Sequence, residues 1–411
     1  MTQAPRRSFL KGALTAGVGA AAAGAAGYSL HGTPAAAAVV PAAGFLPPVP
    51  FHGEHQAGIA PASQNQTAVI SFTATAEGRA ELTDLFRALT SRARFLATGG
   101  TPPPVGISAP PSDSGTLGPT VVPDGLTVTV GVGSTLFDDR YGLAGQLPAK
   151  LYPMQPFPND DLDQAQCGGD IVLQLSAGST DTVMHALRDI ARNTRGGMQA
   201  NWRIDGFTSP ARPAGTVPRN TFGFMDGISN PSPGEFDSLV WIQPGTRGEP
   251  SWTAGGSYFV VRLIRMLVEF WDRVDIGEQE DMIGRRRASG YPLSEMSIYA
   301  DPQYDLDPDG TIIPQSAHMR LANPRTPQTA DSRILRRAYN YDRGIDEVGN
   351  LDVGLVFTCF QQDVQRQFEA VQTRLINEPM VDYISPFGGG YFLALPGVQD
   401  SSDYYGRTLL E

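Results

Sequence analysis

The sequence predicts an α+β fold in which strand–helix units recur in both halves of the chain. Segments rich in β-branched residues alternate with segments whose apolar residues recur at helical spacing. The same order of elements occurs twice, and Pro- and Gly-rich stretches separate the units. The length of 411 residues suits two domains or one large one.

The first half is expected to contain three strands and two helices. Residues 67–75, 126–133 and 170–177 have the composition or alternation of strands. Residues 80–96 and 180–193 carry apolar side chains on one face at helical spacing. A β-α-β unit followed by a β-α unit is typical of a ferredoxin-like arrangement.

The second half repeats this order of elements without visible sequence identity. Residues 257–264 predict a strand, and the mostly apolar residues 354–360 predict a buried one. Residues 266–276 have apolar side chains at i, i+3, i+4 and i+7, and residues 364–375 show a similar stripe. Each of these two segments is therefore expected to form a helix.

Three stretches between these elements are expected to be surface loops. Residues 99–118 and 231–256 are rich in Pro and Gly. Residues 301–309 hold four aspartates and resemble a calcium-binding loop. Because Pro308 interrupts the pattern and the glutamate twelve positions on is missing, we expect a solvated turn instead.

The charge balance is acidic. The net charge of −11 falls to −14 when residues 1–38 are left out, because they hold three basic residues and no acid. This balance argues against nucleic acid or an anionic membrane surface as a partner. The only two cysteines, Cys167 and Cys359, have no zinc-like spacing, and we expect two buried small residues rather than a disulfide.

The N-terminus has the pattern of a targeting segment. Arg6 and Arg7 open a twin-arginine motif, a weakly apolar stretch follows from residue 12 to residue 30, and residues 35–38 are small enough for cleavage. We expect residues 1–38 to be a twin-arginine signal peptide, with an uncleaved anchor as the alternative. The mature protein would then be periplasmic or extracellular, with the twin-arginine export machinery as a partner and no stable membrane span.

One motif places a single carboxylate in apolar surroundings. In the segment TFGFMDGISNP, residues 221–231, Asp226 stands between Gly223 and Gly227 and follows three apolar side chains. Glycine lets the backbone adopt positive φ and lets a planar ligand approach closely. An acid in an apolar site is a candidate proton shuttle. A turn or helix-cap aspartate is the alternative, because Asp-Gly is a common turn pair.

Two further motifs lie about ninety residues later. Residues 316–326 read SAHMRLANPRT and residues 334–341 read ILRRAYNY. His318 is one of five histidines, and for an isolated histidine a packing role would be the preferred interpretation. For Arg336, a surface charge is the alternative to a functional role.

Together these motifs resemble those of the dye-decolourising peroxidases, a family of haem enzymes, and they are most similar to its exported, deferrochelatase-like branch. The resemblance extends from PFHGEHQAGI at residues 50–59 to GGGYFLALPG at residues 388–397, nearly the whole mature chain. It implies two ferredoxin-like halves with antiparallel sheets and haem in the C-terminal half. We expect the domains to span residues 39–222 and 223–411.

The resemblance also implies a cofactor and roles for single residues. The cofactor is expected to be haem b, with His318 as the iron ligand. Asp226 would move a proton between the oxygens of hydrogen peroxide, and Arg336 would stabilise the negative charge that develops during cleavage. Gly227 would lie against the cofactor.

Two further expectations concern the surroundings of His318 and rest on positions in the chain. The second imidazole N–H of His318 needs an acceptor, for which Asp363 is the first candidate and Asp352 the second. Arg320, and less favourably Arg325, could pair with haem propionates if the segment is extended.

The function implied is that of a haem peroxidase. Hydrogen peroxide would be reduced through a ferryl intermediate, and a dye-like or phenolic small-molecule reductant would be oxidised in one-electron steps. Release of iron from haem with the porphyrin intact, a haem carrier without turnover, and a non-haem binding protein remain alternatives. Both a monomer and a homodimer are compatible with the sequence.

Overall fold

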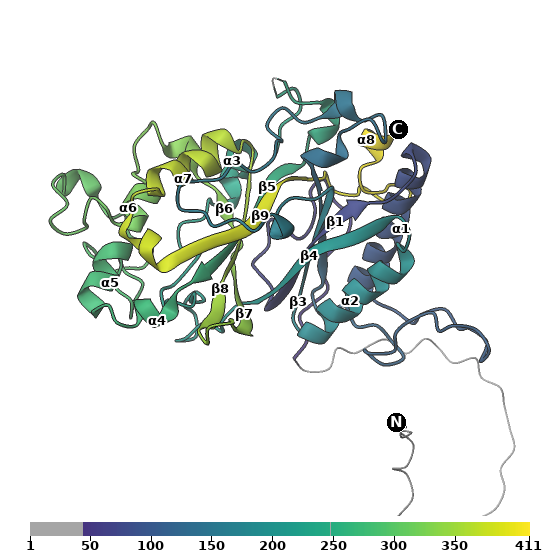
Figure 1. Cartoon of the computed structure of the whole chain (residues 1–411), viewed down its shortest axis with the longest axis horizontal. Helices are drawn as coiled ribbons and strands as arrows, with labels where there is room; N and C mark the ends of the chain where they lie inside the picture. The colour runs from purple at the N-terminus through teal and green to yellow at the C-terminus, as the bar shows by residue number, and fades with distance from the viewer. Residues whose placement is uncertain (1–43, 247) are drawn as a thin grey trace, which may run out of the picture. The chain divides into compact units, whose positions relative to one another are not determined.

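The N-terminal half of the chain forms a four-stranded antiparallel sheet in the order β4-β1-β3-β2. In this computed structural model, which describes residues 44–246 and 248–411, the strands are β1 (Gln66–Ala74), β2 (Thr127–Gly133), β3 (Ile171–Ala177) and β4 (Met198–Phe207). Helix α1 (Arg79–Thr98) follows β1 and helix α2 (Thr180–Asn193) follows β3; Figure 1 shows both helices beside these strands. This order is that of a ferredoxin-like unit.

The C-terminal half repeats the unit in the order β9-β5-β8-β7. Its strands are β5 (Ser257–Met266), β6 (Leu335–Arg336), β7 (Tyr339–Ile345), β8 (Leu351–Gln361) and β9 (Ile384–Ala394). Its helices are α3 (Phe236–Leu239), α4 (Val268–Trp271), α5 (Ile276–Ile283), α6 (His318–Ala322), α7 (Ala370–Leu375) and α8 (Arg407–Leu410). The prediction of two ferredoxin-like halves with antiparallel sheets is confirmed.

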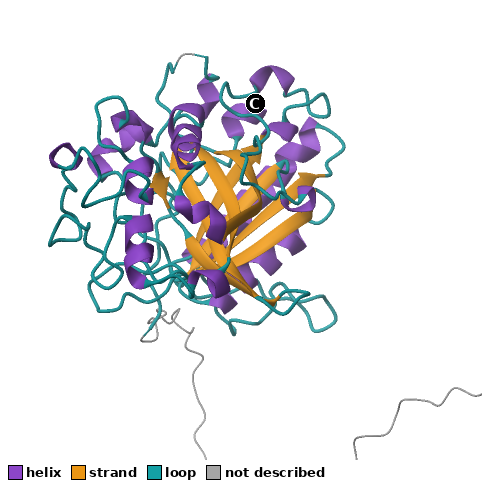
Figure 2. Cartoon of the chain, turned by 60° about the vertical axis from the view of Figure 1, so that its left-hand side comes forward, coloured by secondary structure: helices purple, strands orange, loops and turns teal. Residues whose placement is uncertain are grey.

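The two sheets join into one closed barrel. Strand β2 pairs with β9, β4 pairs with β7, and β5 pairs with both β8 and β9. Closure leaves no free strand edges within this ring, which removes a route to edge-to-edge aggregation. Figure 2 shows the strands in the centre, with helices and loops around them.

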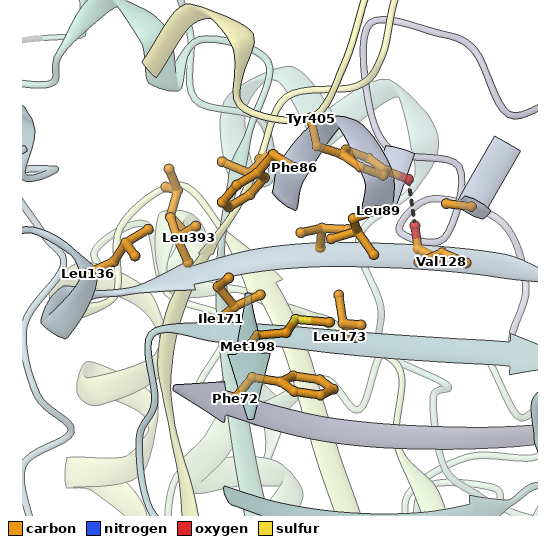
Figure 3. Close-up of a cluster of buried hydrophobic side chains, with 14 of the residues drawn as sticks. Phe72, Phe86, Leu89, Val128, Leu136, Ile171, Leu173, Met198, Leu393 and Tyr405 are labelled. Atoms are coloured by element: carbon orange, nitrogen blue, oxygen red, sulfur yellow. Dashed lines mark hydrogen bonds between the residues drawn. The ribbon is translucent and has the colours of Figure 1, made fainter. Parts of the chain in front are cut away.

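A large apolar core holds the N-terminal helices against the sheet. Phe86 and Leu89 of α1 meet Ile171 and Leu173 of β3 in the cluster drawn in Figure 3. The phenol of Tyr405, near the C-terminus, donates a hydrogen bond of 3.0 Å to the backbone carbonyl of Val128 in β2. The C-terminal segment is therefore part of this core.

Most of the elements predicted from sequence are confirmed, with one clear exception. The helix predicted at residues 266–276 does not form, because β5 runs to Met266 and two separate helices, α4 and α5, follow it. The break has a local cause, since the carboxylate of Asp275 accepts a hydrogen bond of 3.0 Å from the backbone N–H of Glu278 and so caps a new helix. The sequence did not predict β4, β7 or β9.

The sequence also led to predictions for the two cysteines, for membrane spans and for the N-terminal segment. Both cysteines are free thiols; Cys359 is buried and Cys167 is half-buried. Within residues 44–246 and 248–411, no helix has the length and apolar character needed to cross a membrane. The predicted signal peptide, residues 1–38, lies outside the described residues.

The predicted solvated turn at residues 301–309 is wrong for one aspartate. Asp307 is only 5% exposed, and its carboxylate accepts hydrogen bonds from the backbone N–H groups of Thr311, Ile312 and Ile313. It also contacts the guanidinium of Arg320. The bond from Ile313, opposed by burial and assisted by Thr311, lowers the pKa of Asp307 to about 2.

Asp307→Asn should therefore lower the unfolding temperature at neutral pH and change its pH dependence. The folded pKa lies below the ordinary value, so the carboxylate contributes stability that is present above about pH 4 and lost as the pH falls towards 2. Thermal unfolding of the two proteins should converge over that range, whereas the exposed Asp309→Asn control should match the wild type throughout. A gap that stays constant with pH would contradict this role.

Candidate active site

The C-terminal half contains a cavity of about 240 Å³ with mainly apolar walls. Strands β5 and β8, helices α6 and α7, and the loop that holds the Asp226 motif all contribute to it. The apolar lining includes Phe224, Ile264, Met266, Leu355, Phe357 and Phe368. Three residues singled out from the sequence, Asp226, His318 and Arg336, also line this cavity.

His318 is the first residue of α6, and its imidazole is held by a carboxylate. Its Nδ1–H donates a hydrogen bond of 2.6 Å to Oε2 of Glu378, which is 3% exposed. Burial lowers the pKa of His318, but the charge and hydrogen bond of Glu378 outweigh it, so the net shift is upward. The bond to Nδ1 fixes the ring and leaves Nε2 as the nitrogen available to a ligand in the cavity.

The acceptor predicted from sequence is therefore wrong. Asp363 caps the turn that follows β8, where its Oδ1 accepts the backbone N–H of Arg366 at 3.0 Å. Asp352, the second candidate, accepts hydrogen bonds from Tyr341 and Arg343 instead. Glu378 lies sixty residues after His318, and no motif in the sequence marks the contact.

The loop of residues 218–231 presents Asp226 to Arg336. Nη2 of Arg336 lies 3.0 Å from Oδ1 of Asp226. The same oxygen accepts a hydrogen bond of 2.6 Å from the backbone N–H of Gly227, whereas Oδ2 has no donor among the described residues. Gly227 has φ +84°, so the turn favours glycine for its backbone conformation. Gly227 itself does not line the cavity, although its neighbours Asp226 and Ile228 do.

Asn230 fixes this loop to the strand that carries Arg336. Its side-chain amide donates to the backbone carbonyl of Arg336 at 2.9 Å and accepts the backbone N–H of Arg336 at 3.0 Å. Because successive side chains of a strand alternate, Arg337 points away from the cavity and contacts the carbonyl groups of Ile59 and Pro61. The two-point contact of Asn230 therefore sets the distance between Asp226 and Arg336.

Arg320 does not have the position that the sequence suggested. Its guanidinium is buried and donates to Asp307 and to the carbonyl of Ile313, so it does not line the cavity. The prediction assumed an extended segment, but residues 318–322 form α6, where two residues correspond to a rotation of about 200°. Arg325 does line the cavity and pairs with Asp301 at 3.1 Å.

Comparison with known proteins decides the family. The family model for the N-terminal part of Dyp-type peroxidases matches residues 56–208, and the model for the C-terminal part matches residues 217–399. The chain belongs to the Dyp-type peroxidase family. As a member it is an oxidoreductase, a haem peroxidase.

Curated relatives and solved structures agree with this assignment. The deferrochelatases of Yersinia pestis and of Escherichia coli strain K12 are each 46% identical over 368 residues, covering 88% of this chain and 85% and 87% of those proteins. A Dyp-type peroxidase from Cellulomonas bogoriensis has a TM-score of 0.80 at 35% identity, covering 90% of this chain and 99% of that one. Ferric DtpA from Streptomyces lividans has a TM-score of 0.79 at 33% identity, covering 89% and 97%.

The residues that line the cavity of this peroxidase are suited to binding haem. Apolar side chains offer a surface for the faces of a porphyrin, and the Nε2 atom of His318 is a suitable iron ligand. Asp226 and Arg336 supply the polar groups that a peroxide would need. Arg285, Arg325 and Arg333 add cationic groups to the lining.

Glu378→Gln should weaken haem retention and reactivity with peroxide by about 10- to 100-fold, the usual effect of removing a partner of a metal-ligating histidine. The glutamine oxygen can still accept the Nδ1–H bond, but the negative charge that makes the imidazole a stronger donor is lost. Transfer of haem to an excess of a haem-scavenging protein measures the first effect. Glu249→Gln, at a carboxylate that accepts from Tyr258 outside the cavity, is the matched control.

Proposed function

We propose that this protein is a haem b peroxidase that reduces hydrogen peroxide and oxidises dye-like or phenolic reductants, with His318, Asp226 and Arg336 as its working residues. One observation carries the proposal: a carboxylate-held histidine and an aspartate–arginine pair line the same apolar cavity. A haem carrier would need only the first of these.

His318 would hold the iron of haem through Nε2, and the bound haem supplies the redox chemistry. Glu378 keeps the proton on Nδ1 and orients the ring. Because Glu378 is buried, little water competes for this bond. The chain thus fixes both the tautomer and the direction of the ligand.

In the reaction with hydrogen peroxide, Asp226 would act as the proton carrier. Its Oδ1 is occupied by the N–H of Gly227 and by Arg336, so Oδ2 is the atom that takes a proton from one peroxide oxygen and returns it to the other. The guanidinium of Arg336 offers N–H donors to the oxygen that gains negative charge. The apolar walls strengthen this electrostatic effect by excluding water.

The proposal is tested by titrating the apoprotein with haem and then assaying peroxide-dependent oxidation of a phenolic reductant. A saturable Soret band at one haem per chain with sustained turnover supports it. A stable Soret band without turnover favours a carrier.

A second function, release of iron from haem with the porphyrin intact, is favoured by the names of the curated relatives, which are deferrochelatases with 46% identity. The products decide between the two functions. Fluorescent metal-free porphyrin that accumulates in step with haem loss favours iron release, whereas oxidised reductant with haem retained favours peroxidase activity.

We further propose that residues 39–222 and 223–411 are the two domains. Separate ferredoxin-like sheet orders in the two halves support this division.

We also propose that residues 1–38 direct twin-arginine export to the periplasm or beyond, because Arg6 and Arg7 precede a weakly apolar stretch. Replacing both arginines by lysine should abolish export, measured as the fraction of the protein outside the cytoplasm. Equal export of the variant and the wild type would contradict this proposal.

A further inference from the structure

The wall of the cavity is rich in methionine. Of the nine methionines within residues 44–246 and 248–411, four line it: Met225, Met266, Met319 and Met380. A thioether fills irregular apolar space well, but hydrogen peroxide can convert it to a sulfoxide. Leucine has a similar volume and lacks this sensitivity. Four oxidisable sulfur atoms therefore line the cavity to which the reaction with peroxide is assigned.

Met225 is the methionine closest in the chain to the residues proposed to act on peroxide. It directly precedes Asp226, and both residues line the cavity. Among the described residues, two thioether sulfurs accept a hydrogen bond, those of Met154 and Met266, and the sulfur of Met225 does not. The bond to Met266 comes from the hydroxyl of Thr221 at 2.7 Å and withdraws electron density from that sulfur. Of the two methionines beside this loop, Met225 thus has the more nucleophilic sulfur.

The sulfur of Met225 is also tightly packed. The residue is 8% exposed, and an added Cβ at Gly290 would lie 2.7 Å from its Sδ, so the sulfur rests against the loop that follows α5. A sulfoxide oxygen directed towards Gly290 would force this loop or the loop of residues 218–231 to move. An oxygen directed the other way would place a polar acceptor in the cavity that Asp226 and Arg336 line. Either position disturbs the site at which peroxide would react.

We propose that Met225 is the residue that hydrogen peroxide modifies when reductant is scarce, and that this modification switches the reaction with peroxide off. In the step, the O–O bond of peroxide breaks and one oxygen forms the S–O bond of methionine sulfoxide. The other oxygen leaves as water with both protons, so the sulfur loses the two electrons that the peroxide gains. The proposal rests on the proposed function, because the cavity must react with peroxide.

Peptide mass spectrometry of the haem-loaded protein, sampled during exposure to excess hydrogen peroxide without reductant, tests the proposal. Met225 should become a sulfoxide before Met296, which is 86% exposed, and before Met282, which is 5% exposed and outside the cavity lining. The sulfoxide fraction of Met225 should rise in step with the loss of activity. A phenolic reductant should slow the oxidation of Met225 and leave that of Met296 unchanged.

The apoprotein separates cavity chemistry from oxidation by peroxide in bulk solution. Without the reaction in the cavity, accessibility alone decides the order, so Met296 should be oxidised before Met225. The comparison needs no measurement of activity, because the same peptides are quantified in both samples.

Matched variants connect the modification to inactivation. Met225→Leu removes the sulfur and nearly conserves the volume. In excess peroxide its activity, relative to its own starting value, should decay at least about threefold more slowly than that of the wild type. Met282→Leu makes the same change at a buried methionine of α5 outside the cavity lining, and it should decay as the wild type does.

The outcomes distinguish this proposal from the proposed function. Oxidation of Met296 before Met225 in the haem-loaded protein overturns the proposal, and so does equally fast oxidation of Met225 with and without haem. A Met225→Leu protein that loses activity at the wild-type rate, or wild-type protein that stays active with Met225 oxidised, also overturns it. Each of these results leaves the peroxidase assignment in place. A haem-loaded protein that consumes no peroxide overturns the proposed function as well.

Discussion

Asp226→Ala lowers the second-order rate constant for reaction of the haem-loaded protein with hydrogen peroxide by about two to four orders of magnitude, the usual contribution of a positioned acid–base group. The reason is that Oδ2 of Asp226 is the open carboxylate oxygen beside Arg336 in the cavity. Rapid mixing with peroxide, followed at the Soret band, measures the rate constant. Haem content per chain should stay at the wild-type value, because Asp226 does not hold the cofactor in this account.

Two comparisons sharpen this result. Asp226→Asn keeps the size of the side chain but cannot accept the proton, so it should be nearly as slow as the alanine variant. Asp205→Ala, at an exposed aspartate of β4 paired with Arg203, is the matched control and should react as the wild type does. An Asp226→Ala protein that reacts within about threefold of the wild-type rate would remove Asp226 from the mechanism.

Arg336→Leu should slow the same reaction by about 10²- to 10³-fold, the loss expected when one preorganised donor to a developing negative charge is removed. Leucine keeps much of the side-chain volume, so the apolar packing changes little while the charge is lost. The measurement is again the rate constant with peroxide.

The neighbouring arginine provides the control for this second prediction. Arg333→Leu also removes a cation from the cavity lining, but that cation is paired with Glu235 rather than with Asp226. It should change the rate constant by less than about threefold. If both arginine variants are equally slow, the general positive potential of the cavity is responsible and a specific role for Arg336 is excluded. The double variant of Asp226 and Arg336 should lose less than the sum of the two single effects, since the residues form one ion pair.

The three residues proposed to act in the reaction were singled out from the sequence through motifs. Asp226, His318 and Arg336 lie within short segments whose local pattern is distinctive, and the chain brings them to one cavity. Glu378 could not be predicted in this way, because its contact with His318 depends on how the segment before β9 returns across the sheet. Tertiary contacts of this kind leave no periodic signal along the chain.

The predictions for Arg320 and for residues 266–276 were wrong for local reasons. The position predicted for Arg320 assumed an extended segment after His318. Residues 318–322 instead form α6, and the guanidinium of Arg320 donates to Asp307 rather than lining the cavity. Residues 266–276 have helical periodicity, but the capping carboxylate of Asp275 and the continuation of β5 divide them. Arg285 was missed because an arginine among three adjacent arginines suggests a solvated surface, and only its burial distinguishes it.

The most direct test of the central claim is to mix the haem-loaded wild-type protein with one equivalent of hydrogen peroxide and record the Soret and visible bands over time. The account predicts a rapid shift of the Soret band that reverses when a phenolic reductant is added, with the haem retained. A Soret band that peroxide leaves unchanged, or that decays only as metal-free porphyrin appears, would contradict the claim that Asp226, Arg336 and His318 form a peroxidase site.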